Sequence, residues 1–209
     1  MDRLNELKKD VENVDIEMQD INIESDSKRI KFFKDVDIIQ NNINNVKEHI
    51  NKLIVINDNI QQSTTDDNIY SRKICILVEK SDKILKSTKS MIDYYSNDED
   101  RMIKNIIMGL TKSLVNILKN YQDVQKRIKT DNKNKAKRQI KIINPNITDK
   151  EIDNILISPS SILKNSILTS DNKISNIYLN VTNKYQDVII LESSITELNQ
   201  MFIDFALLI

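Results

Sequence analysis

Apolar residues recur at steps of three and four along four long segments of the chain, which is the spacing that places one apolar stripe on an α-helix. The pattern predicts helices over about 28–60, 67–96, 98–130 or longer, and 174–209. The predicted stripe of the first helix includes Phe33, and that of the second includes Leu77, Ile84 and Met91. The acidic cluster from Ser96 to Asp100 is expected to cap the third helix. Residues 1–27 are acidic with few apolar positions, so we expect an arm there. A single amphipathic helix cannot cover its own stripe in water. We therefore predict an all-α protein in which residues 28–130 form an antiparallel three-helix bundle.

Residues 131–173 are predicted to link the bundle to the last helix. The residues from Thr148 to Glu151 have the pattern of a capping box, which opens a short helix over about 149–157, between Pro145 and Pro159. Within the bundle, Ser81 and Thr88 on the stripe of the second helix indicate either a close neighbouring helix or a partly hydrated stripe. The only glycine, Gly109, costs about 1 kcal/mol in a helix unless a neighbouring helix needs close approach.

The last predicted helix has the most regular repeat. From residue 188 onward, the apolar steps alternate between three and four, which is typical of a left-handed coiled coil. This seam consists of Val188, Leu191, Ile195, Leu198, Phe202, Phe205 and Ile209. The chain ends on an apolar run without a capping residue, so we expect the coiled coil to continue beyond residue 209.

Composition narrows the function classes. The chain has 1 Gly, 2 Pro and no Trp, which is too few turn residues for barrels, sandwiches or phosphate-binding loops. With 31 basic and 31 acidic residues, it has no overall attraction to nucleic acid. No window approaches eighteen consecutive apolar residues, so no membrane span is predicted.

Candidate chemistry is sparse. One His and one Cys cannot build a His-based zinc site or an internal disulfide. For His49, beside Glu48, a solvated helix position is favoured over a general base; for Cys75, a small buried apolar role is favoured over a nucleophile. We predict no enzyme activity, no cofactor and no metal. For the basic run over 126–141, a solvated helix extension is favoured, and contact with anionic lipid or an acidic partner is the alternative. The run lacks the interleaved aromatic residues of a groove that binds single-stranded nucleic acid.

The segment 185–206 carries a resemblance to a known family. Its sequence, YQDVIILESSITELNQMFIDFA, resembles the start of the SNARE motif of syntaxins, roughly I-x-x-L-E-x-S-I-x-E-L-x-x-M-F-x-D-M-A. The resemblance implies that the seam forms the layers before the central ionic layer of a SNARE complex. The glutamine that defines the Qa class would lie three residues beyond residue 209.

Two shorter matches agree in order with that family. Ile152 and Asp153 stand where syntaxins have a Leu-Glu pair in the linker that helps to hold the closed state. At the N-terminus, the matching residues resemble the peptide with which syntaxins engage SM-family regulators, and they are Asp2, Arg3, Leu4, Glu6 and Leu7.

The resemblance implies a Qa-type t-SNARE of vesicle docking and membrane fusion, autoinhibited by its Habc-like bundle. Implied partners are SNAREs of the Qb, Qc and R types, an SM-family regulator, and a plasma membrane or endomembrane, reached from its cytoplasmic face through a C-terminal anchor beyond residue 209. No nucleic-acid partner is expected. Two alternatives stay open: a self-associating coiled-coil scaffold or adaptor, and a lipid-binding helical bundle.

Overall fold

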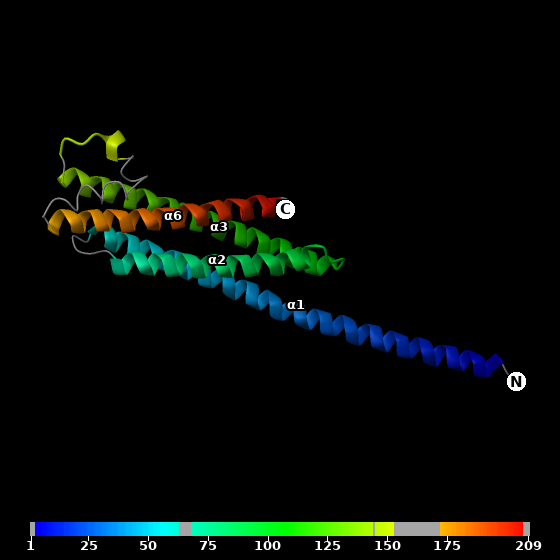
Figure 1. Cartoon of the computed structure of the whole chain (residues 1–209). Helices are drawn as coiled ribbons and strands as arrows, with labels where there is room; N and C mark the ends of the chain where they lie inside the picture. The colour runs from blue at the N-terminus through cyan, green and yellow to red at the C-terminus, as the bar shows by residue number, and fades with distance from the viewer. Residues whose placement is uncertain (1–2, 63–67, 144, 153–171, 207–209) are drawn as a thin grey trace.

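Long helices account for most of the chain in the computed structural model, which describes residues 3–62, 68–143, 145–152 and 172–206. For residues 3–25, 68, 143, 172–180, 182 and 185 it describes the backbone only. The long helices are α1 (Arg3–Gln62), α2 (Asn68–Ser96), α3 (Arg101–Ile143) and α6 (Asn172–Ala206) (Figure 1). No strand occurs in the described ranges, and the predicted all-α class is confirmed.

The first three helices form an antiparallel bundle, and α6 packs on one side of it (Figure 1). Contacts between α6 and α2 advance along both helices in the same direction, from Cys75 with Asp187 to Lys86 with Glu197. Contacts with α3 run in opposite directions, from Lys129 with Glu192 to Gln122 with Asn199. The last helix is therefore parallel to α2 and antiparallel to α3.

The core lies along stripes of each helix that differ in detail from the predicted ones. Phe32 is fully buried, whereas Phe33, which the sequence placed on the stripe of the first helix, is 47% exposed. In α2, the buried apolar positions are Ile74, Val78, Leu85, Ile92 and Tyr95, and the predicted Leu77, Ile84 and Met91 are half-buried beside them. Neighbouring positions on a helix both satisfy steps of three and four, so packing decides between them.

Polar pairs cross the contact between α1 and α2. Thr88 and Ser81 are buried, and each hydroxyl donates to the carbonyl oxygen four residues earlier. Thr88 also accepts a bond from Asn42 at 3.0 Å, and Ser81 pairs with His49 at 2.9 Å. These positions therefore mark a close neighbouring helix and not a hydrated stripe. The solvated position expected for His49 is wrong, because its ring is half-buried against α2.

The helix ends differ from the predicted ones mainly at the N-terminus. Helix α1 begins at Arg3 rather than near residue 28, and its first part extends past the end of the bundle (Figure 1). Extending an existing helix avoids the cost of nucleating a new one, which favours helix over an irregular arm. The C-terminal end of α3 lies at Ile143, two residues before Pro145.

The turn between α2 and α3 is capped by the acidic cluster predicted there. Asp100 accepts a hydrogen bond from the amide of Met102 at 2.8 Å, which is the bonding of an N-cap residue. Asp98 accepts from the amide of Asp100 and pairs with Lys28 of α1 at 2.8 Å. These contacts join the turn to α1 and fix where α3 begins.

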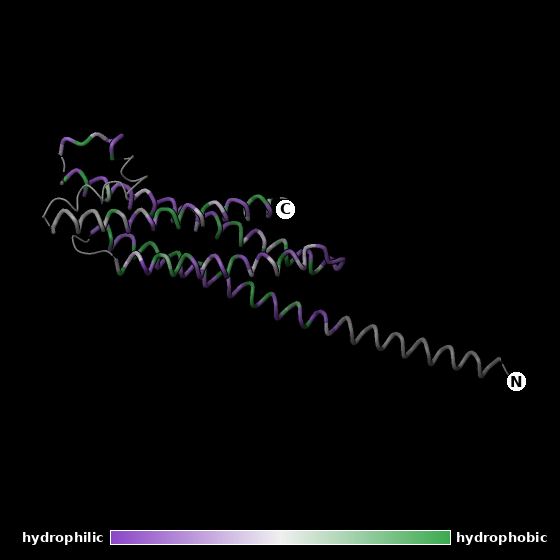
Figure 2. Tube along the Cα trace, viewed as in Figure 1, coloured by the Kyte–Doolittle hydropathy of each residue, from purple (hydrophilic) through white to green (hydrophobic). Residues whose placement is uncertain are grey.

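Figure 2 shows hydrophilic and hydrophobic residues alternating at short intervals along the helices whose side chains are described. No helix within the described ranges is both long and apolar enough to cross a bilayer. The glycine in α3 needs no packing explanation, because a methyl group added at Gly109 would meet no atom within 4 Å.

Candidate functional site

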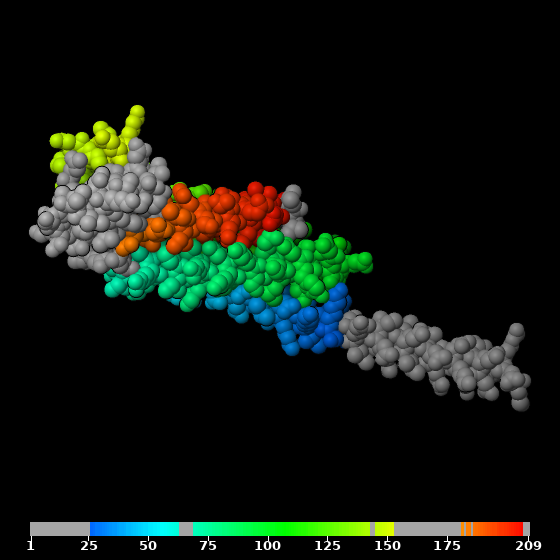
Figure 3. All heavy atoms as spheres, viewed as in Figure 1, coloured from blue at the N-terminus to red at the C-terminus, as the bar shows by residue number. Residues whose placement is uncertain are grey.

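The groove between α2 and α3 holds α6 along its length, and Figure 3 shows α6 lying against α2 as one continuous surface. Four apolar side chains of α6 enter the same core that α1, α2 and α3 share. They are Leu191, Leu198, Met201 and Phe205, none more than 6% exposed. The groove is thus a binding site for an amphipathic helix.

Ion pairs border this groove on both sides. Lys86 and Lys89 of α2 reach Glu197 and Asp204 at 2.9 and 3.2 Å. On the other side, Lys129 of α3 meets Glu192 at 2.6 Å. Partly exposed pairs of this kind contribute little energy, but they favour one register of α6 over its neighbours.

A buried hydrogen-bond network lies at the centre of the groove. Gln125 of α3 donates to the Ser194 hydroxyl oxygen at 2.8 Å, and that hydroxyl donates to Asp82 of α2 at 3.0 Å. Tyr121 donates to the same carboxylate at 3.2 Å. Burial raises the pKa of Asp82, while the bonds from Ser194 and Tyr121 partly offset that rise. One hydroxyl of α6 therefore links α6 to both α2 and α3.

A second polar contact lies about two turns closer to the start of α2. The Cys75 thiol donates to Asp187 of α6 at 3.5 Å. Burial, and to a smaller extent the nearby Asp187 charge, raises the pKa of Cys75 to about 12. At neutral pH the sulfur is therefore a protonated thiol, which argues against the nucleophilic role and agrees with a structural one.

The residues of the predicted coiled-coil seam differ in how far the groove buries them. Val188, Leu191, Leu198 and Phe205 are buried, Ile195 is half-buried and Phe202 is 41% exposed. Ile209 lies outside the described residues. Between residues 187 and 205, the groove also buries three positions that the seam did not include, namely Asp187, Ser194 and Met201. Their spacing was visible in the sequence, but two of them are polar and so gave no apolar signal.

The linker contains the predicted capping box, and it contacts the bundle through Ile152, which follows that box. The amide of Thr148 donates to Glu151 at 2.9 Å, and the amide of Glu151 donates back to the Thr148 hydroxyl at 3.4 Å. The helix that follows buries Ile152 completely, in a small cluster with Ala136 and Ile140 of α3 and Val181 of α6. Asp153, the other predicted linker residue, lies outside the described residues.

The remaining predicted site is the N-terminal peptide. Arg3, Leu4, Glu6 and Leu7 belong to the first turns of α1, whose backbone alone is described, and Asp2 lies outside the described residues.

The basic run of α3 makes contacts within the protein. Arg127 pairs with Asp58 of α1 at 3.1 Å, and Lys141 pairs with Asp149 of the linker at 2.8 Å. The buried Lys135 ammonium donates to the carbonyl oxygen of Ile60, where the end of the α1 dipole favours a cation. These side chains thus connect α3 to α1 and to the linker.

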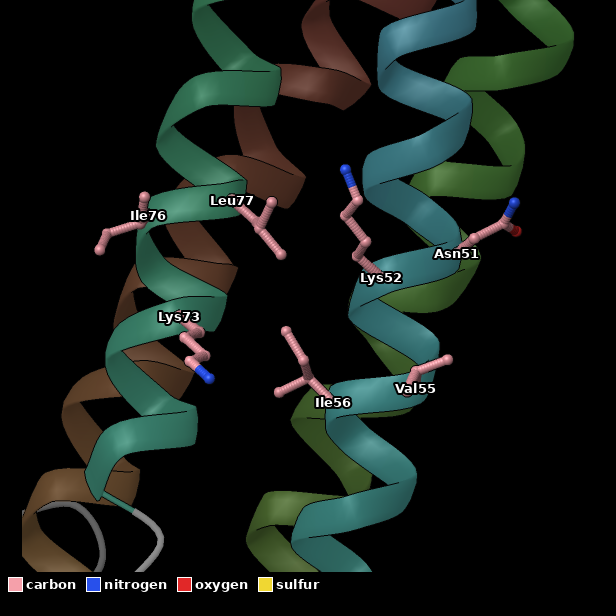
Figure 4. A pocket seen from close by; sticks show the side chains of 7 residues that line it. All are labelled: Asn51, Lys52, Val55, Ile56, Lys73, Ile76 and Leu77. Carbon is pink, nitrogen blue, oxygen red and sulfur yellow. The ribbon is translucent and has the colours of Figure 1, made fainter.

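Within the described part of the chain, no three His, Cys, Asp or Glu side chains are placed to hold a metal ion. A cavity of about 530 Å³ opens between α1 and α2, where Leu77 and Ile56 point toward one another across the gap (Figure 4). Lys52, Lys73 and Asn51 are its polar lining residues, and its lining includes no carboxylate or imidazole. Lys52 pairs with Glu48, which lies outside the cavity lining, at 3.6 Å.

Docking of α6 is expected to tighten as the pH falls from neutral toward the ordinary carboxyl range. Burial raises the pKa of Asp82 and Asp187 in the docked state, so docking is weakened at neutral pH and that cost is relieved as pH falls through the raised values. Hydrogen bonds from Gln200 and Lys89 lower the pKa of Asp204, so its favourable contribution persists to below the ordinary carboxyl range.

The other groups that face the two buried carboxyls are Tyr121, Lys86 and Glu197 near Asp82, and Ser71, Cys75 and Lys184 near Asp187. Amide-exchange protection of α6, corrected for intrinsic rates at pH 7, 6 and 5, should rise with acidity, and the rise should be smaller in Asp187→Asn. Weaker protection at pH 5 would contradict the expectation. Burial lowers the pKa of His49, so the contact of α1 with α2 should loosen over the same range and serves as an internal comparison.

Comparison with protein families agrees with this architecture. The family model described as Syntaxin matches residues 26–167, which cover α1 from residue 26, α2, α3 and the linker, and end before α6. Syntaxins are a non-enzymatic family that takes part in SNARE complexes. Because the match covers more than half of the sequence, the chain belongs to the syntaxin family.

Proposed function

We propose that this syntaxin is a Qa-type SNARE protein whose SNARE helix, α6, is held closed by its own bundle. The observation that carries the proposal is the burial of α6 in the groove, where Leu191, Leu198 and Phe205 are at most 2% exposed. These residues also lie on the seam that resembles a SNARE motif. One apolar stripe cannot be covered by the bundle and by other SNARE helices at the same time.

Two mutually exclusive ways of burying one stripe make a switch whose populations follow the free-energy difference between them. In the open state, α6 forms a coiled coil with helices of the Qb, Qc and R types. Assembly toward a membrane anchor beyond residue 209 brings a vesicle and its target membrane together, on the cytoplasmic face of a plasma membrane or endomembrane. An SM-family regulator binds the N-terminal peptide, Asp2 to Leu7.

A single substitution tests whether the closed state blocks assembly. Because the Cys75 sulfur lies 3.5 Å from an Asp187 oxygen, Asp187→Cys places two sulfurs within reach of a disulfide after a small shift. The oxidised variant should assemble with Qb, Qc and R helices at least about tenfold more slowly than the reduced one, because the cross-link holds α6 on α2. Assembly is read by the gain in helicity on mixing.

The matched control is Ile189→Cys, whose side chain is 42% exposed and which should assemble equally under both conditions. Equal rates for oxidised and reduced Asp187→Cys would reject autoinhibition. No helicity gain with any SNARE helices would reject the Qa role, and a concentration-independent dimer in sedimentation would support the self-associating scaffold instead.

A further inference from the structure

The docked face of α6 differs from its predicted coiled-coil seam, as becomes clear when the positions of α6 are labelled a to g as a heptad repeat. With Val188, Ile195 and Phe202 at a and Leu191, Leu198 and Phe205 at d, the g positions hold Asp187, Ser194 and Met201. The groove buries the d and g positions, all at most 6% exposed. Along the a position, exposure rises from 9% at Val188 to 41% at Phe202.

The chemistry of the two faces differs as well. The a positions are all apolar, as the interior of a coiled coil requires. Two of the three g positions are polar, and the bundle supplies a partner for each. Ser194 bonds to Asp82 and Gln125, and Asp187 accepts from Cys75.

Buried polar groups discriminate more sharply than apolar ones, because a partner left without its hydrogen bond costs free energy. A helix with the same leucines at d but without Ser194 would remove the acceptor of the Gln125 amide and one of the two hydroxyl donors to Asp82, leaving only Tyr121. In a coiled coil the same g positions flank the core, where polar residues are common. Ser194 therefore favours the bundle strongly and the coiled coil hardly at all.

We propose that α6 has two overlapping helix-binding faces, d with g for its own bundle and a with d for SNARE helices, and that Ser194 and Asp187 specify the first. The assignment of the second face rests on the proposed function. The faces share the d residues and, at the start of the seam, Val188, so substitutions at Ser194 and at Phe202 should separate docking from assembly.

The test is Ser194→Leu in the full chain. It removes the hydroxyl that Gln125 and Asp82 need and adds bulk to a filled site, so α6 amide exchange should rise at least about tenfold. Alkylation of the native Cys75 by iodoacetamide should accelerate by a similar factor, because undocking removes Asp187 from the thiol. Ser194→Ala, without added bulk, should give a smaller rise in both rates, and circular dichroism checks that the bundle stays folded.

Two variants provide the contrast. Ser193→Leu makes the same change on the exposed neighbour and should leave both rates within about twofold of the wild type. Phe202→Ser, at an exposed a position, should leave docking within the same limits but slow assembly with Qb, Qc and R helices. If Ser194→Leu fails to loosen α6, or if either contrast variant loosens it equally, the proposal is overturned. Failure of every variant to assemble would reject the proposed function, while the docking rates alone would decide this inference.

Discussion

Replacing Leu198 with aspartate is expected to release α6 from the groove while the bundle of α1, α2 and α3 stays folded. Leu198 is 2% exposed in the shared core, so the substitution both removes a buried leucine and places a carboxylate in an apolar site. Large-to-small core changes cost about 2–5 kcal/mol, and an unpaired buried charge adds to that cost. Because 1.4 kcal/mol is a factor of ten, amide exchange in α6 should rise about a hundredfold or more.

Hydrogen exchange followed by mass spectrometry would measure this peptide by peptide. The control is Thr196→Asp, two residues away on the exposed side of the helix, which introduces the same charge without entering the core. Peptides from α2 and α3 should keep most of their protection in both variants. Unchanged exchange in α6, or collapse of the whole bundle together with α6, would contradict a separable docked helix.

Truncating Ile152 to alanine is expected to loosen the start of α6 and the linker without altering the distant end of the bundle. Its side chain is fully buried between α3 and Val181 of α6. Loss of a buried isoleucine costs about 2–5 kcal/mol, and here only the docked linker makes the contact. Exchange around Val181 should therefore rise about thirtyfold or more, since 2 kcal/mol corresponds to roughly that factor.

A graded series makes this prediction sharper. Ile152→Val should cost only about 0.5–1.5 kcal/mol, and Ile142→Ala, at a position 75% exposed, should cost almost nothing. The linker would be shown not to hold the closed state if exchange near Val181 were the same in all three variants. Combining Ile152→Ala with Leu198→Asp tests whether the two contacts act on one docked state, because their effects would then fall short of additivity.

The two substitutions address different parts of the proposed switch. Leu198 lies at a d position that both predicted faces of α6 use, so its loss should weaken docking and SNARE assembly together. Ile152 touches α6 through Val181 only when α6 is docked, so its loss should shift the population toward the open form. Faster assembly in Ile152→Ala, with slower assembly in Leu198→Asp, is the combination expected of an autoinhibited SNARE protein.

Much of the architecture follows from local pattern. Steps of three and four predicted the helices, and the acidic cluster before α3 predicted its cap at Asp100, because helix periodicity and capping involve residues a few positions apart. The extension of α1 to Arg3 was missed, since the low apolar content of the first residues outweighed their helical spacing. The partners of Ser81 and Thr88 were also beyond local pattern, as they lie on another helix.

The sequence by itself determined that the protein is helical and that α6 carries a heptad repeat, and it predicted no catalytic set. Only the tertiary structure decided which side of each helix faces the core. Phe32 is buried instead of Phe33, and Ser194 is buried ahead of Ile195, although each pair satisfies the same spacing. Adjacent residues on a helix point about 100° apart. The choice between them depends on what the neighbouring helices supply, here the hydrogen bonds of Asp82 and Gln125.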